Sequence, residues 1–165
     1  MNIFDFAMKM EKDGENYYRE LASSCKIEGL ERILNMLADD EVKHYNALKK
    51  LKEGTYVDIP GTEILRNAKN IFFELKATKE TREEISYDES VVKLYNKAID
   101  IEKKSEDFYR EKANEVDQPE VKDIFLKIAE EERRHQFLLK NTVEFLSRPQ
   151  TWIECSEFYR LDDYY

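Results

Sequence analysis

Apolar residues recur along most of this chain in alternating steps of three and four positions, the spacing of one buried face of an α-helix. The periodicity predicts four long helices, over residues 2–25, 28–53, 88–115 and 118–147. Pro119 fits the first turn of the last helix, where its missing N–H is tolerated. The links within the first pair and within the second pair are short, so we expect two antiparallel helical hairpins.

The stretch between the two predicted hairpins, residues 54–87, is much longer than the links inside them. Gly54, Pro60 and Gly61 indicate a loop, and the segment NAKNIFFELK predicts a short additional helix. The sequence holds only 4 Gly and 3 Pro among 165 residues, too few for the turns of a β-sandwich. We therefore predict an all-α protein, a four-helix bundle in which a long connection crosses from the second helix to the third.

The two predicted hairpins are similar in sequence at a constant offset of 91 residues. AMKMEKDGENYYRELA at 7–22 aligns with AIDIEKKSEDFYREKA at 98–113. The same offset aligns LADDEVKH at 37–44 with IAEEERRH at 128–135, and no gap is needed between the two segments. The sequence therefore predicts an internal duplication, with one pair of helices in each half.

Six ionisable residues occupy positions of the apolar face where hydrophobic side chains are expected: Glu11, Glu41, His44, Glu102, Glu132 and His135. Each histidine follows a glutamate by three positions, which places both side chains on one helix face. Burying four carboxylates is costly unless their charge is compensated, as two divalent cations would do. A Glu from each of two helices and a Glu-x-x-His from each of the other two form a known carboxylate metal site. The duplicated pattern predicts such a two-metal site, against the alternatives of surface glutamates and ordinary core histidines.

Tyr18 and Tyr109 lie seven residues after the first glutamate of each repeat, two turns along the same helix face. One interpretation is that each hydroxyl forms a hydrogen bond to a ligand carboxylate, orients it and takes part in electron transfer. The other is that both residues are ordinary core tyrosines. Gly14 and Ser105 are equivalent small residues between the glutamate and the tyrosine of each repeat. They indicate either room for an oxidant, a water or a shifting carboxylate, or close packing of the helices.

Other acidic residues lie beside the predicted ligands in both repeats. Glu15 and Glu106 are interpreted as surface residues or as partners of the ligands. The acidic pairs Asp39–Asp40 and Glu130–Glu131 are interpreted as solvated faces, although one of them could orient a histidine.

Over residues 2–147, this pattern of ExxxxxxY followed by ExxH, present twice, resembles the rubrerythrin-type branch of the ferritin-like di-iron carboxylate proteins. The resemblance implies a ferritin-like bundle in which the six residues bind two iron ions, with Mn or Zn as alternatives. It also implies that Tyr18 and Tyr109 lie beside the ligands. Typical members carry a further glutamate three residues after the third-helix ligand, and Ser105 occupies that position here.

The resemblance implies a redox protein that reduces peroxide or dioxygen. A ferroxidase or iron carrier, a non-redox Zn or Mn protein, and a structural interaction module remain alternatives. Typical members also carry a rubredoxin-like domain as electron donor. The two cysteines of this chain, Cys25 and Cys155, form no CxxC pair, so we expect a separate donor protein such as a rubredoxin.

Charge and chain ends narrow the expected partners and compartment. The net charge of −9 argues against nucleic acid and anionic membranes as partners, and it suits cations. The N-terminal residues show no secretory signal pattern and no apolar run has the length of a membrane span, so we expect a cytoplasmic protein with reduced thiols. Residues 1–147 are expected to form the bundle, and the aromatic, acidic tail, 148–165, to pack on it or on a second subunit of a homodimer.

Overall fold

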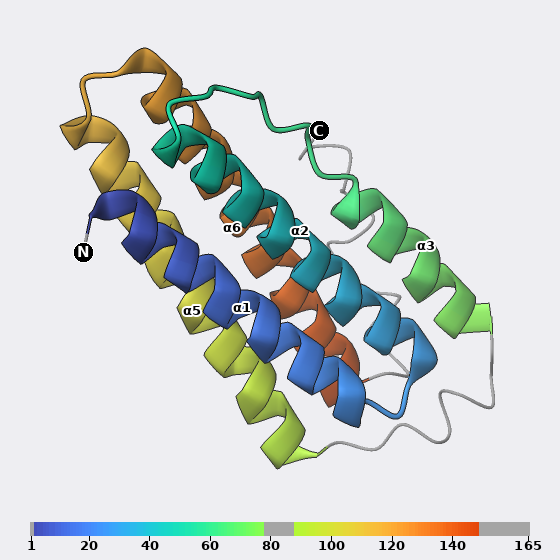
Figure 1. Cartoon of the computed structure of the whole chain (residues 1–165). Coiled ribbons are helices and arrows are strands. Elements are labelled where there is room, and N and C mark those ends of the chain that lie inside the picture. The colour runs from blue at the N-terminus through green and yellow to red at the C-terminus, as the bar shows by residue number, and fades with distance from the viewer. Residues whose placement is uncertain (1, 78–87, 149–165) are drawn as a thin grey trace.

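The structure, a computed structural model, describes residues 2–77 and 88–148. These residues form five helices and no strand: α1 (Ile3–Ser24), α2 (Glu28–Lys52), α3 (Ile64–Ala77), α5 (Glu89–Glu115) and α6 (Pro119–Ser147) (Figure 1). The predicted all-α fold is confirmed, and the four long helices begin and end within one residue of their predicted bounds. The predicted tail beyond residue 148 lies outside the described residues.

The helix ends follow from local sequence chemistry. Asn2 caps α1, because its Oδ1 accepts a hydrogen bond of 2.8 Å from the backbone N–H of Asp5. Asp88 caps α5 in the same way through the N–H of Ser90. Pro119 lies in the first turn of α6, as predicted. After α2 the chain turns at Gly54, whose φ of 85° lies in the left-handed region that glycine adopts without strain.

Two helical hairpins make up the bundle (Figure 1). α1 packs along α2, and α5 packs along α6. α2 and α6 contact each other across the middle, and α3 packs on both of them at the side away from α1 and α5. α1 and α5 form the opposite side, where the rings of Phe6 and Phe108 lie 5.2 Å apart. The long connection after α2 therefore forms a helix of its own before the chain resumes at α5.

The predicted apolar faces form the interior. In α2 and α6 the positions that follow the alternating spacing of three and four are all buried: Leu30, Leu34, Leu37, Glu41, His44, Leu48, Leu51, Val121, Phe125, Ile128, Glu132, His135, Leu139 and Thr142. In α5 the same spacing predicts a buried face from Val91 to Lys112 through Tyr95, Ala98, Glu102, Ser105 and Tyr109. This prediction is wrong at both ends, where Val92 and Ala113 are buried in place of Val91 and Lys112. An α-helix has 3.6 residues per turn, so a straight helix drifts away from a strict heptad pattern towards its ends.

α3 extends the predicted short helix and covers α2 and α6. Its ring of Phe72 lies 5.4 Å from that of Phe145 in α6. Gly29, at the start of α2, permits the close approach, since a Cβ there would lie 2.9 Å from the Cγ2 of Ile71. This side of the bundle is therefore closed by apolar packing.

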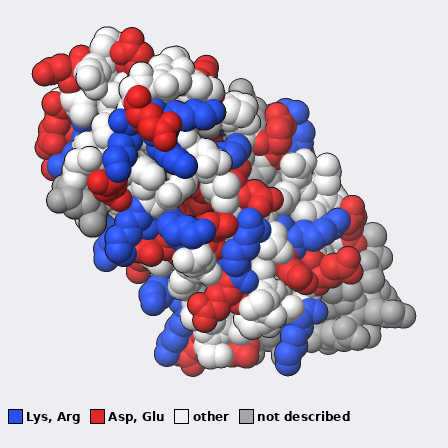
Figure 2. Space-filling model, viewed as in Figure 1, with Lys and Arg blue, Asp and Glu red and all other residues white. Residues whose placement is uncertain are grey.

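Acidic and basic side chains are interspersed over the face seen in Figure 2. Many of them pair along a helix, as Lys9 does with Asp13 at 2.8 Å and Lys103 with Asp107 at 2.9 Å. No helix within the described ranges is long and apolar enough to cross a membrane.

Candidate metal centre

The six predicted ligands meet in the middle of the bundle, and each of these residues is at most 3% exposed. Their donor atoms form two sets of four, in each of which all atoms lie within 4.8 Å of one another. One set is Glu11, Glu41, His44 and Glu132, and the other is Glu41, Glu102, Glu132 and His135. Glu41 and Glu132 belong to both sets, so the arrangement suits two cations that share two carboxylates.

The two halves of the cluster repeat the same contacts. The Nδ1 atom of His44 lies 3.2 Å from Glu11 Oε2 and 3.1 Å from Glu132 Oε1. In the other half, the Nδ1 atom of His135 lies 3.2 Å from Glu102 Oε1 and 3.3 Å from Glu41 Oε1. The two imidazole rings are nearly parallel, with centroids 6.1 Å apart. The sequence duplication is thus reproduced as a two-fold arrangement of donors.

Three carboxylate oxygens show that these residues fit metal ions. Glu41 Oε1, Glu102 Oε2 and Glu132 Oε1 are buried and accept no hydrogen bond from the described part of the chain. Buried polar atoms normally have a partner, so a cluster of unpaired carboxylate oxygens fits the binding of cations. Carboxylate oxygens and imidazole nitrogens suit iron, manganese and zinc. Two divalent ions would balance the four glutamates.

The shared carboxylates differ electrostatically from the outer two. Burial and the neighbouring glutamates raise the pKa of Glu41 and of Glu132 well above the usual value. Burial also opposes ionisation of Glu102, but the charge of His135 and the hydrogen bonds to Glu102 outweigh it and lower the pKa of Glu102 to about 2. Without metal, the shared glutamates therefore hold protons that a cation would displace.

The Nε2 atom of each histidine, on the side of the ring away from the cluster, contacts a buried carboxylate. His44 Nε2 lies 3.2 Å from Glu131 Oε1, and His135 Nε2 lies 2.9 Å from Asp40 Oδ2. With Nε2–H donated to these oxygens, Nδ1 is the ring atom that faces the cluster. The interpretation of Asp40 and Glu131 as solvated residues is wrong, because both are at most 7% exposed. The alternative, that a residue of these acidic pairs orients a histidine, fits the contacts of both. Asp39 lies on the exposed surface, as expected.

Further residues fix these supporting carboxylates. Thr62, in the loop before α3, donates its hydroxyl to Asp40 at 2.7 Å. The Nζ atom of Lys43 lies 3.2 Å from Asp40 and 3.8 Å from Glu131, between the two carboxylates. Sequence reasoning missed Thr62 and Lys43. The acidic residue directly before the ligand glutamate in both repeats was the available signal for Asp40 and Glu131.

The two tyrosines reach across the bundle. Tyr18 of α1 donates its hydroxyl to Glu102 of α5, and Tyr109 of α5 donates to Glu11 of α1 at 2.6 Å. Burial and the charge of the bonded glutamate raise the pKa of both phenols well above the usual value. Both hydroxyls therefore keep their protons and act as donors that orient the outer carboxylates.

Glu15 and Glu106 occupy different environments despite their equivalent sequence positions. Glu15 forms a partly exposed ion pair with Lys12 at 2.9 Å. Glu106 is buried, and it accepts hydrogen bonds from Arg110 at 2.8 Å and from Gln136 at 2.9 Å. Neither residue belongs to the two donor sets.

A cavity of about 530 Å³ lies between α1 and α5 and reaches the cluster. Glu41, Glu102 and Glu132 line it together with Gly14 and Ser105. A Cβ at Gly14 would lie 3.2 Å from Glu41 Oε2, so glycine keeps space beside a shared carboxylate. The cavity gives small molecules a route to the centre from the side opposite α3.

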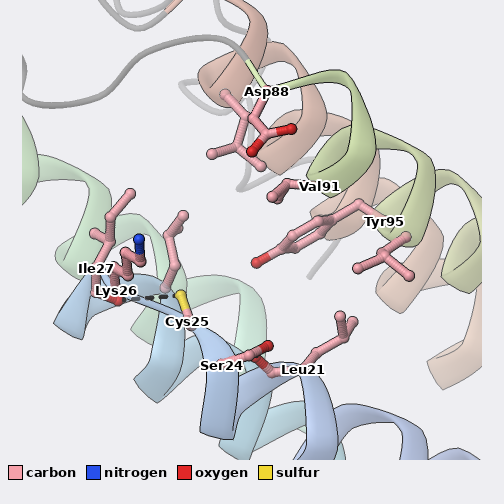
Figure 3. A pocket seen from close by; sticks show the side chains of 11 residues that line it. Leu21, Ser24, Cys25, Lys26, Ile27, Asp88, Val91 and Tyr95 are labelled. Carbon is pink, nitrogen blue, oxygen red and sulfur yellow. Dashed lines mark hydrogen bonds between the residues drawn. The ribbon is translucent and has the colours of Figure 1, made fainter.

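A second cavity, of about 350 Å³, lies where α1 ends and α5 begins (Figure 3). Cys25 and Tyr95 line it, and the Sγ of Cys25 donates to the carbonyl of Ile27 at 3.4 Å. Burial raises the pKa of the Cys25 thiol, which is free in the structure. Cys155 lies outside the described residues. No residue of the two donor sets lines this cavity.

The comparisons with known proteins agree with this geometry. A family model described as Rubrerythrin matches residues 2–143. No curated protein and no solved structure matches the chain. The match covers all four long helices up to the last turns of α6 and includes every candidate ligand. The chain therefore belongs to the rubrerythrin family.

Proposed function

We propose that this protein is a non-haem di-iron oxidoreductase that reduces peroxide. The observation that carries the proposal is the pair of overlapping donor sets that share Glu41 and Glu132. Two metal ions held by shared carboxylates can act together in one two-electron step. Cleavage of a peroxide O–O bond takes two electrons, whereas reduction of dioxygen to water takes four. Two ions therefore supply the electrons for complete reduction of a peroxide, whereas they reduce dioxygen only as far as hydrogen peroxide.

Some residues of the centre would bind the metal ions, and others orient the residues that bind them. Glu11 and His44 would bind one ion, Glu102 and His135 would bind the other, and the shared glutamates would bind both. Ferrous iron bound there supplies one electron per ion to the oxidant. The tyrosine hydroxyls hold the outer carboxylates, and the supporting carboxylates hold the histidines with Nδ1 towards the centre.

Re-reduction of the site would require a separate electron donor, and we propose a small redox protein of the rubredoxin type. The chain has only two cysteines, and they are far apart in sequence. A rubredoxin-type iron site needs four thiolates, so this chain cannot supply that donor itself.

An anaerobic titration with Fe(II), followed by stopped-flow oxidation, tests the proposal. We expect two Fe(II) per chain and faster oxidation by hydrogen peroxide than by dioxygen, with one peroxide consumed per two ions. Binding of well under two equivalents would exclude a di-iron site. Faster reaction with dioxygen and release of ferric iron would instead indicate a ferroxidase, and two bound ions that react with neither oxidant would indicate a non-redox metal protein.

A further inference from the structure

We propose that the cavity between α1 and α5 binds the hydrocarbon part of an organic hydroperoxide whose other end carries a carboxylate. The inference rests on the proposed function, because it names the substrate class of the same site. Fatty-acid hydroperoxides are the simplest members of this class.

The size of the cavity exceeds what hydrogen peroxide requires. Its volume is about 530 Å³, within the range of about 300–1,000 Å³ that is typical of pockets for organic ligands. A water molecule takes about 30 Å³ of liquid volume, and hydrogen peroxide is larger by only one oxygen atom. A channel for hydrogen peroxide alone could be far narrower.

The lining combines the carboxylates of the metal centre with a larger set of apolar side chains. The carboxylates of Glu41, Glu102 and Glu132 form the buried part of the wall. The rest of the wall is mainly apolar or aromatic: Phe6, Met10, Tyr17, Ala98, Ile101 and Phe108. Phe6 is 47% exposed and Ile101 is 36% exposed, so apolar surface continues to the opening. An alkyl chain fits this wall, and a hydroperoxide group fits the carboxylate part.

Two lysines add a charge preference to the cavity. Lys97 and Lys104 both line it from α5 and are exposed, two helical turns apart with Ile101 between them. Neither forms an ion pair within the described part of the chain, and the Nζ of Lys97 lies 5.7 Å from the ring centroid of Tyr17. Asp13, the acidic residue of the wall outside the metal centre, is paired with Lys9 at 2.8 Å. A carboxylate at the outer end of the ligand matches the two free ammonium groups.

Small residues give the ligand access to the centre. Gly14 and Ser105 are equivalent in the repeats, and both line the cavity that the shared carboxylates also line. A long side chain at position 105 would extend into this space, since Ser105 is directed into the cavity from the turn after Glu102. The serine thus opens the route that a larger substrate requires.

The chemistry balances with the reductant that the proposed function supplies. Reduction of ROOH breaks its O–O bond and takes two electrons, which two ferrous ions bound at the centre would supply by becoming ferric. Two protons enter from solvent, so that the products are the alcohol ROH and water. The hydrocarbon part R is unchanged and needs only to be held.

Binding of an unreactive analogue tests the cavity without any turnover. Isothermal titration of the Zn(II)-loaded full chain with dodecanoate should show one saturable site per chain. The Ser105→Leu variant should bind dodecanoate at least about tenfold more weakly, a loss of about 1.4 kcal/mol. Ile101→Glu, at the exposed opening, should weaken binding similarly. Both variants should still bind two zinc ions per chain, which confirms that they fold.

The lysines are tested by charge reversal with a matched control. Lys97→Glu combined with Lys104→Glu should weaken dodecanoate binding about fivefold and leave 1-dodecanol binding unchanged. Lys93→Glu combined with Lys103→Glu reverses two exposed lysines of the same helix that do not line the cavity, and it should change neither. Equal loss of dodecanoate binding in both double variants would overturn the proposed carboxylate contact.

The outcomes separate this inference from the proposed function. Ferrous protein should oxidise with linoleic acid hydroperoxide, and Ser105→Leu should slow that reaction more than the reaction with hydrogen peroxide. A wild-type protein that reacts with hydrogen peroxide but binds no dodecanoate would overturn the inference alone. If the wild-type protein sedimented as an assembly of several copies and the Ile101→Glu variant sedimented at a lower mass, the occupant of this face would be a second copy of the chain. That result would overturn the inference. Failure to react with either peroxide would overturn the proposed function.

Discussion

The two sides of the bundle support the same cluster in opposite ways. On the side of α2 and α6, each histidine is backed by a buried carboxylate, and α3 covers both helices with apolar side chains. On the side of α1 and α5, the outer glutamates are held by tyrosine hydroxyls, and a cavity reaches the shared carboxylates. The same duplicated sequence thus builds a closed side and an open side.

This difference separates two tasks of a metal site. The closed side fixes imidazoles through short contacts that solvent does not reach, which favours a constant ligand geometry. The open side places small residues, Gly14 and Ser105, where a substrate must approach. Changes on the closed side are therefore expected to alter metal affinity, and changes on the open side to alter what reaches the metal.

Removal of both shared carboxylates should have the largest effect. Glu41→Ala combined with Glu132→Ala removes donors from both sets, so the variant should bind neither ion while keeping its helical content. Glu20→Ala combined with Glu111→Ala changes two exposed glutamates that are equivalent in the repeats and should keep two ions per chain. Metal analysis after gel filtration measures the stoichiometry, and two ions retained by the first variant would contradict the assignment.

Loss of a carboxylate behind a histidine should weaken metal binding about 10- to 100-fold. Asp40→Ala and Glu131→Ala each remove the partner of one imidazole Nε2 and free that ring to rotate. Asp39→Ala is the matched control, because its carboxylate pairs with Arg19 at the surface. Competition with a chelator measures the affinities. An equal effect of all three substitutions would show that the closed side does not act through the histidines.

The metal-free protein should lose stability as the pH rises above about 6.5, the ordinary pKa of histidine. Burial opposes the charge of both imidazoles, but the neighbouring glutamates outweigh it and raise the pKa of His44 and His135 well above that value. A group whose pKa is raised by folding stabilises the protein at low pH and loses that contribution as pH rises. Glu41 and Glu132 act in the same direction.

Thermal unfolding across pH measures this effect. Tm should fall with rising pH for the metal-free protein and stay nearly constant for the Zn(II)-loaded protein, since metal replaces the protons. A metal-free Tm that rises over the same range would contradict the electrostatic description of the cluster.

A smaller effect is expected where α3 covers the closed side. Gly29→Ala places a methyl group 2.9 Å from Ile71, which should cost about 1–3 kcal/mol of unfolding free energy. Gly61→Ala is the control, because nothing lies within 4 Å of its added Cβ. Urea denaturation measures both. No difference between the two would indicate that α3 does not pack on α2 as described.

The ligands could be predicted from the sequence because ionisable residues are unusual on an apolar helix face. The same unusual pattern occurs in both repeats, which makes it a stronger signal. The interpretation of Asp40 and Glu131 as solvated residues fails for a physical reason. α2 contacts α1, α3 and α6, and α6 contacts α5, α3 and α2. The buried sector of each of these two helices is therefore wider than the single apolar face that periodicity detects. Thr62 lies in a loop, where no periodicity marks a buried partner. The cavity depends on how far apart α1 and α5 lie, which no local pattern encodes.

A crystal structure of the iron-loaded protein with anomalous scattering at the iron edge tests the central claim most directly. The account predicts two anomalous peaks per chain, one beside Glu11 and His44 and the other beside Glu102 and His135. Glu41 and Glu132 should contact both peaks. A single peak, or two peaks that share no carboxylate, would contradict the account.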